Sequence, residues 1–106
     1  MIPMLNPDGR LVLESKQDYC WRNNKHGVDI NRNFDWEFNG PGSSPIPGHE
    51  EFNGKVAFSE PETRLIRDLA QRFGYDALLS LHSGEQQGWL IYILVILKIK
   101  KIIMDC

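Results

Sequence analysis

Asn31, Arg32 and Asn33 place three strong hydrogen-bonding side chains in a row within the stretch GVDINRNFDW. A guanidinium offers two parallel donors that match a carboxylate, and a neighbouring amide can bind a further oxygen. Adjacent side chains of an extended segment point to opposite sides, so Arg32 and one asparagine can share a ligand only where the backbone bends. The row predicts either a carboxylate-binding site or a surface arginine in a structural ion-pair network.

A second arginine, Arg22, follows Trp21 and lies a short polar segment before the first. Two cations at one cleft would suit an anionic end of a substrate and an oxyanion that develops during reaction. An arginine beside a tryptophan can equally be a stacked surface pair. Both interpretations of Arg22 are open at this point.

The spacing His-x-x-carboxylate can chelate zinc, so the residue three positions after each histidine decides whether it could form a ligand pair. A phenylalanine stands three residues after His49 and cannot bind a metal. A glycine separates His26 from Asp29, and Ser-Gly separates His82 from Glu85. Neither pair lies on one helical turn that would align its side chains, so both are disfavoured as ligand pairs.

His82 ends the apolar stretch DALLSLH, which begins two residues after Gly74. This pattern predicts a buried strand entered from a helix. Folds of the α/β class gather their sites at the carboxyl ends of strands, so His82 is a candidate site residue. The alternative is a hydrogen-bonded core histidine.

Turn signals indicate the elements that surround these residues. Residues 1–5 predict a buried strand that runs into a tight turn at Asn6–Gly9. Residues 39–54 are crowded with Gly, Pro, Ser and Asn, and therefore predict a surface loop.

A helix is predicted to start at Ser-Glu-Pro-Glu, where Ser59 would cap the first amides, Glu62 would reach back, and Pro61 is tolerated in the first turn. Gly74 would end it. The helix would have an apolar face of Leu65, Ile66, Leu69, Ala70 and Phe73, opposite a charged face of Arg64, Arg67, Asp68 and Arg72. A helix followed by a buried strand indicates an α/β sheet.

Composition limits the class of protein. A chain of 106 residues with 42% hydrophobic and 25% charged residues is typical of a soluble globular domain, or of part of one. A formal net charge of -2 gives no field that would attract nucleic acid or anionic lipid. Cys20 and Cys106 can form at most one pair, so no disulfide framework is predicted. The opening MIPMLNPDG contains no secretion signal and is typical of the middle of a fold.

Residues 88–106 differ in character from the rest of the chain. The nine apolar residues Trp89 to Leu97 are too few to span a bilayer, and lysines mixed with isoleucines follow them. Three interpretations are open: a buried strand with a frayed end, a segment for a partner or membrane surface, or translated sequence foreign to the fold.

Five segments, in order IPMLNPDGR, CWRNN, GVDINRNFDW, FSEPET and LLSLHSGEQQ, resemble the zinc carboxypeptidase family of the pancreatic A/B type. The resemblance covers residues 1–87 and corresponds to the central part of the catalytic domain. It implies an α/β fold with a central mixed β-sheet flanked by helices. Residues 88–106 are then a divergent hydrophobic and basic tail, which we interpret as a truncated gene model or read-through from about residue 88.

The resemblance also implies residue roles. His82 corresponds to the third zinc ligand of the family, and Arg22 to the arginine that polarises the scissile carbonyl and stabilises the oxyanion. Asn31 and Arg32 correspond to the pair that binds the terminal carboxylate of the substrate. Asp29 corresponds to the residue that orients the first zinc-binding histidine. The implied reaction is Zn²⁺-dependent hydrolysis of the C-terminal peptide bond of peptides or proteins.

The chain also departs from the family pattern. The family's His-x-x-Glu, which carries two zinc ligands, is expected before the NPDG turn, and its general-base glutamate and its substrate-closing tyrosine are expected after His82. None of these is present in the sequence. The alternative hypothesis is therefore a non-catalytic truncated fragment that lacks two zinc ligands and the general base.

Three further expectations follow from the resemblance. Asn33, Phe34 and Trp36 would be structural supports. Related enzymes could trim glutamate side chains or cell-wall peptides, but FSEPET and NRNFDW favour the digestive or regulatory branch. The family location is secreted or vacuolar/lysosomal.

Overall fold

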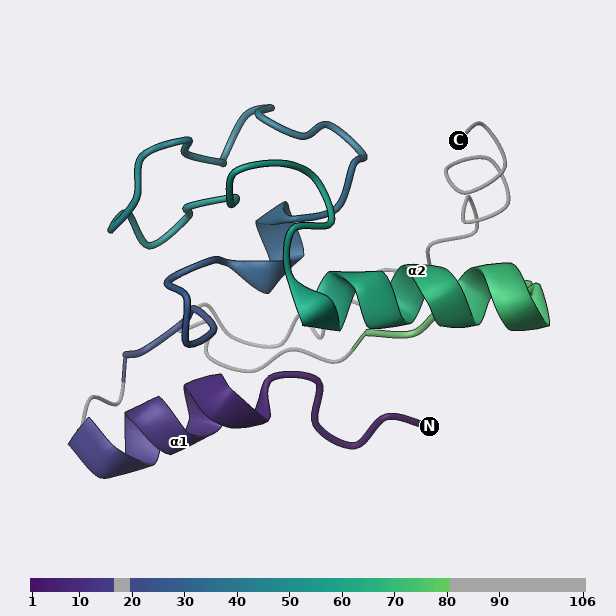
Figure 1. The fold of residues 1–106 in the computed structure, drawn as a ribbon, viewed down its shortest axis with the longest axis horizontal. Coiled ribbons are helices and arrows are strands. Elements are labelled where there is room, and N and C mark those ends of the chain that lie inside the picture. Colours follow the sequence, from purple (N-terminus) through teal and green to yellow (C-terminus); the bar gives the residue numbers. More distant parts are fainter. Residues whose placement is uncertain (17–19, 81–106) are drawn as a thin grey trace, which may run out of the picture. The chain divides into compact units, whose positions relative to one another are not determined.

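The computed structural model describes residues 1–16 and 20–80 of the chain. Those residues contain helix α1 (Pro7–Lys16), the 3-10 helix η1 (Ile30–Arg32) and helix α2 (Pro61–Phe73), which Figure 1 shows along the chain. The chain divides into two compact units, Met1–Ile66 and Arg67–Cys106. The candidate residues from Arg22 to Arg32 all belong to the first unit.

Helix α1 occupies the place of the predicted turn, so that prediction was wrong. The Oδ1 of Asn6 accepts a hydrogen bond from the backbone N–H of Gly9 at 2.9 Å, and Pro7 opens the helix. Residues 1–5 form no strand. The reason is an ambiguity of chemistry, since asparagine and proline favour a tight turn and a helix start alike.

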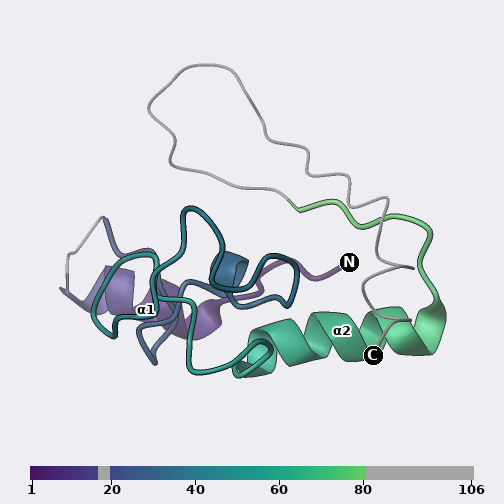
Figure 2. The same cartoon turned by 90° about the horizontal axis from the view of Figure 1, so that it is seen from above.

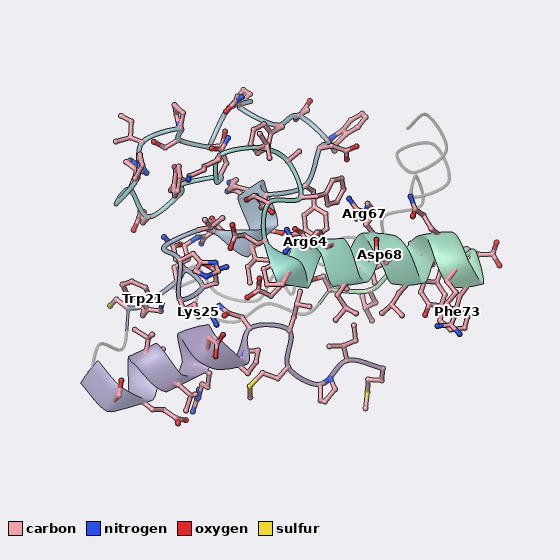
Figure 3. The ribbon with its side chains drawn as sticks, viewed as in Figure 1. Trp21, Lys25, Arg64, Arg67, Asp68 and Phe73 are labelled. Carbon is pink, nitrogen blue, oxygen red and sulfur yellow. The ribbon has the colours of Figure 1, made fainter. Side chains whose placement is uncertain are left out.

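Two contacts attach α1 to the segment that carries Arg22. The Nδ2 of Asn6 donates to the carbonyl oxygen of Asn23 at 3.3 Å, and the Nζ of Lys25 lies 3.0 Å from the Oδ2 of Asp8. Figure 3 shows Lys25 beside α1. Both partners of the ion pair are substantially exposed, so it contributes little to stability.

Residues 39–54 form the predicted loop, which Figure 2 shows as a chain without helices or strands. A single parallel bridge joins Ser44 to Phe52. In it the N–H of Ser44 donates to the oxygen of Glu51 at 2.9 Å, and the N–H of Asn53 donates to the oxygen of Ser44 at 3.0 Å. The loop is therefore closed at its base, while residues 45–50 at its tip are all exposed.

Helix α2 confirms the predicted helix and its end. Gly74 has a φ of 61°, the left-handed conformation that follows many helices, and its N–H donates to the oxygen of Ala70 at 2.9 Å. Of the apolar face, Ala70 is 5% exposed, whereas Leu65 and Phe73 are 46% and 57% exposed. The ring of Phe73 lies 5.9 Å from that of Tyr75.

The capping box predicted at the start of α2 does not form. The hydroxyl of Ser59 donates to the Oε1 of Glu60 at 2.8 Å, and the Oε2 of Glu62 accepts from the Nδ2 of Asn24 at 3.3 Å. Instead, the first turn is held by Arg64, whose Nη1 donates to the carbonyl oxygens of Phe58 and Ser59. Figure 3 shows Arg64 at this end of the helix.

The interior of the first unit is mainly polar. Among its described residues, the buried apolar side chains are Val28 and Phe52. The buried polar side chains are those of Asn23, Asn24, Asp29, Asn33, Ser44, Asn53, Glu60 and Thr63. Buried polar groups are costly without partners, so hydrogen bonds hold these segments in place.

The predicted sheet has no strand within residues 1–16 and 20–80. Residues 76–80, the described part of the predicted C-terminal strand, are irregular, and His82 and the tail 88–106 lie outside the described residues. Within the described part of the chain, no helix is long and apolar enough to cross a membrane.

Candidate functional site

The bend required around Asn31 and Arg32 is supplied by η1. Asp29 caps this helix, because its Oδ1 accepts a hydrogen bond from the N–H of Asn31 at 3.1 Å. The N–H of Arg32 donates to the oxygen of Asp29 at 2.9 Å, and that of Asn33 donates to the oxygen of Ile30 at 3.1 Å. The polar row therefore lies in a tight turn and not in an extended strand.

Asp29 also binds Arg22. The Nε of Arg22 lies 2.7 Å from the Oδ2 of Asp29, whose side chain is 4% exposed, while the Arg22 side chain is 46% exposed. A buried carboxylate needs a charged or hydrogen-bonded partner, and Asp29 has one on each oxygen. Asp29 thus brings together the segment of Arg22 and the turn that carries Asn31.

The outer ends of two candidate side chains form no hydrogen bonds with the described residues. Among residues 1–16 and 20–80, the guanidinium of Arg22 hydrogen bonds only through its Nε, and its two terminal nitrogens form no hydrogen bond. The side-chain amide of Asn31, an exposed residue, likewise forms none within this part of the chain. Both groups can donate to an oxygen of a ligand.

Arg32 is oriented differently, because its side chain is directed to the loop of residues 39–54. Its Nε donates to the oxygen of Gly42 at 2.5 Å, and its Nη2 lies 3.9 Å from the Oε1 of Glu51. In the described part of the chain, the side chains of Arg32 and Arg22 share no hydrogen-bond partner. In this conformation Arg32 belongs to a structural network, the alternative that its sequence left open.

The described residues contain no group of three or more His, Cys, Asp or Glu side chains that could hold a metal ion. His82 lies outside them, as does its pairing with Glu85. The pairing of His26 with Asp29 does not occur, because Asp29 binds Arg22 and Asn31 while His26 binds Glu60. His49 accepts a hydrogen bond from the N–H of Glu51 through its Nδ1 at 3.1 Å.

A buried carboxylate that the sequence did not indicate lies at the start of α2. Glu60 is 6% exposed, and its Oε2 lies 2.6 Å from the Nδ1 of His26 and 2.8 Å from the Nδ2 of Asn24. Burial raises the pKa of Glu60, but the hydrogen bonds from His26, Asn24 and Ser59, together with the charge of His26, outweigh burial and hold that pKa below 4.5. No spacing in the sequence pairs residue 60 with residue 24.

Asn33 is a fully buried centre of hydrogen bonding, which confirms its predicted structural role. Its Nδ2 donates to the hydroxyl of Ser59 at 2.8 Å and to the oxygen of Asn53 at 2.8 Å. Its Oδ1 accepts from the hydroxyl of Thr63 at 2.7 Å and from the N–H of Glu60 at 3.1 Å. The turn η1 is therefore attached to the first turn of α2.

The two aromatic supports predicted beside Asn33 differ from each other. The ring of Phe34 meets that of Phe58 edge to face, with centroids 5.9 Å apart. Trp36 is 59% exposed, so burial does not support its predicted structural role, which stays a prediction.

The comparison with protein families gives the same class as the motifs. The family described as zinc carboxypeptidase matches residues 1–93, so the chain belongs to the zinc carboxypeptidase family. This confirms the resemblance found in the sequence.

Three relatives illustrate the similarity. Carboxypeptidase A2 of Rattus norvegicus is 35% identical over 95 residues, which cover 81% of this chain and 22% of the relative. Carboxypeptidase A1 of Bos taurus is 39% identical over 90 residues, covering 76% of this chain and 21% of the relative. A protein of Talaromyces marneffei named inactive metallocarboxypeptidase ecm14 is 32% identical over 101 residues, which cover 82% of this chain and 17% of the relative. The chain spans about a fifth of the length of these curated relatives.

Proposed function

We propose that the protein containing these residues is a zinc-dependent metallocarboxypeptidase that hydrolyses the C-terminal peptide bond of peptides or proteins. Family membership supports the reaction class. The observation that carries the proposal is the buried Asp29, which holds Arg22 at 2.7 Å and the N–H of Asn31 at 3.1 Å. We further propose the α/β fold with a central mixed β-sheet, on the same family membership.

The proposed roles follow from which donors are accessible. The terminal nitrogens of Arg22 would stabilise the oxyanion that forms at the scissile carbonyl. The amide of Asn31 and the guanidinium of Arg32 would bind the terminal carboxylate and restrict cleavage to the last residue. Arg32 would exchange its contacts with Gly42 and Glu51 for the substrate carboxylate. The ion pair with Glu51, at 3.9 Å, would cost little to break, and a hydrogen bond to the carboxylate would replace the one to Gly42.

A bound Zn²⁺ would supply a polarised carbonyl and a water of lowered pKa. We propose His82 as one of its ligands, on the family resemblance alone. Because the described residues contain no group of three metal-binding side chains, they do not make a zinc site by themselves. Asp29 would hold the ring of a zinc-binding histidine in addition to Arg22, as family resemblance implies.

The proposed carboxylate grip is tested by comparing two peptides of one sequence, one with a free C-terminal carboxylate and one with a C-terminal amide. Arg32→Ala should weaken binding of the free acid by about 10- to 100-fold and leave the amide nearly unchanged, because a charge-assisted pair is lost. Arg10→Ala is the matched control, since Arg10 is exposed and pairs only with Glu14 four residues along α1 among the described residues. Equal losses for both peptides in Arg32→Ala would refute the role.

A second candidate is a non-catalytic member of the family, which the similarity to a relative named inactive favours. Elemental analysis of the purified protein separates the two candidates. A catalytic protein should hold about one zinc per chain, whereas a lone histidine should hold none. On family membership we also propose a secreted or vacuolar/lysosomal location. The same ground favours peptide or protein C-termini as substrates over glutamate side chains or cell-wall peptides.

A further inference from the structure

We propose that Glu60 is a positioning residue for the carboxylate-binding site, an inference that rests on the proposed function. Two segments carry the candidate donors: the Arg22 segment, residues 21–28, and the η1 segment, residues 29–33. Glu60 bonds both. Its carboxylate holds the Arg22 segment through Asn24 and His26, and its backbone N–H donates to the Oδ1 of Asn33 at 3.1 Å.

A shift of the Glu60 carboxylate would shift the whole Arg22 segment, because hydrogen bonds within residues 24–28 hold this segment together as one turn. The Oδ1 of Asn24 accepts from the N–H of His26 and from the N–H of Val28, each at 3.0 Å. The N–H of Asn24 also donates to the oxygen of Val28 at 2.9 Å. Asn24 is fully buried, so its amide is fixed with the oxygen on its own loop and the nitrogen on Glu60. Moving the carboxylate of Glu60 therefore moves the loop between Arg22 and Asp29.

The η1 segment is also held at Glu60, but by its backbone N–H instead of its side chain. Asn33 directly follows Arg32, and its Oδ1 binds the N–H of Glu60 and the hydroxyl of Thr63. The side chain of Glu60 thus fixes one segment and its backbone fixes the other. Among the described residues, the side chains of Arg22 and Arg32 share no hydrogen-bond partner, so we infer that Asp29 and Glu60 set the spacing of their segments.

A purely structural role for Glu60 makes a different prediction. Loss of stability lowers the fraction of folded protein and weakens the free-acid and amide peptides by the same factor. Loss of position changes the ratio of the two affinities. The loop that the Glu60 side chain holds ends at Asp29, which caps the turn of Asn31, and only the free acid uses the donors of that turn. The ratio is therefore the measurement that separates the two roles.

The experiment uses the protein in its full natural length and a labelled peptide whose last peptide bond is reduced and cannot be hydrolysed, as free acid and as amide. Fluorescence anisotropy gives both dissociation constants. Glu60→Ala should lower the preference for the free acid by about 10-fold, the effect expected when a charge-assisted hydrogen bond is misplaced. Glu60→Gln should retain most of the preference, since its amide oxygen can still accept from Asn24 and Ser59 can accept from its nitrogen.

Two further variants make the result decisive. Glu60→Asp keeps the charge but is too short to reach both Asn24 and His26, so it should lose preference even where Glu60→Ala does not fold. Glu14→Gln is the control, because it removes the charge of an exposed carboxylate of α1 that pairs with Arg10 and touches neither Asn24 nor Asn33 in the described residues, and it should keep the wild-type preference. A wild-type ratio in Glu60→Asp and in any folded Glu60→Ala overturns the positioning role. A wild-type protein that binds both peptides equally overturns the proposed function, and this inference with it.

Discussion

The Nδ1 of His26 lies 2.6 Å from the Oε2 of Glu60 and joins two residues that are 34 positions apart in the chain. The side chain of Glu60 is 8% exposed and that of His26 is 53% exposed. The pair therefore connects a half-exposed loop to the buried start of α2. Because the carboxylate is the buried partner, its protonation has the larger effect on the folded state.

The stability of the protein should fall in acid through Glu60. Its pKa in the folded protein is below 4.5, its ordinary value, so the folded state binds fewer protons than the unfolded state as the pH approaches that value. The contribution of Glu60 is complete above about pH 4.5 and is lost as the pH falls through the folded pKa. Urea unfolding should show the stability difference between wild type and Glu60→Gln narrowing below that pH. A difference that stays constant there would contradict the assignment.

Gly54→Ala should destabilise the protein more than Gly48→Ala. The two glycines have nearly equal φ, 87° and 91°, so both substitutions carry a backbone cost of about 1–3 kcal/mol. A Cβ at Gly54 would lie 2.6 Å from the Oγ of Ser59 and 2.7 Å from the Nδ2 of Asn33, whereas one at Gly48 would meet open space. Crowding should add about 1–3 kcal/mol at Gly54 alone, measured as the difference between the two free energies of unfolding. Equal losses would show that Asn33 is not held tightly.

Gly9→Ala should destabilise the protein although Gly9 lies in a helix. Helix propensity alone predicts a gain of about 1 kcal/mol. A Cβ at Gly9, however, would lie 2.3 Å from the Nδ2 of Asn6 and 2.6 Å from the backbone oxygen of Asn23. The backbone oxygen cannot move without its segment, so we expect a net loss of about 1 kcal/mol or more in denaturant unfolding. Ser15→Ala, at an exposed site near the end of α1, is the control and should be neutral or slightly stabilising.

Asn33→Ala should be one of the most destabilising changes in the first unit. It removes the amide nitrogen that donates to the backbone oxygen of Asn53 and to the hydroxyl of Ser59. It also leaves the buried hydroxyl of Thr63 and the N–H of Glu60 without their shared acceptor. The expected loss is about 3 kcal/mol or more. Asn31→Ala, two residues earlier and exposed, should stay within about 0.5 kcal/mol in the same thermal or urea unfolding experiment. Similar losses at both positions would contradict the buried network.

The sequence was most informative where the physical cause is local. Helix α2 was predicted because its periodicity and the stop at Gly74 lie within one short segment. The family and the candidates Arg22, Asn31 and Arg32 were found because their motifs are contiguous. Asp29 binds Arg22 across only seven residues, within the segment that those motifs define.

What the sequence could not predict depends on contacts between distant segments. Glu60 binds Asn24 across 36 residues, and no local pattern pairs these positions. The same Ser-x-x-Glu spacing that predicts a capping box was overridden because Asn33 and Asn24 take the side chains that would form it. At the N-terminus, Asn6 and Pro7 suit a turn and a helix start equally well, and only the folded structure decides between them.

The closed base of the loop of residues 39–54 makes its tip a place where the chain can be lengthened. Ser44 is fixed on both sides, to Glu51 and to Asn53, so the residues between them can change in number while the neck is kept. The entropy of closing a loop rises only slowly with its length. An epitope or fluorophore-binding peptide grafted between Pro47 and Gly48 would therefore report on this protein in solution without disturbing Asn33 or Glu60.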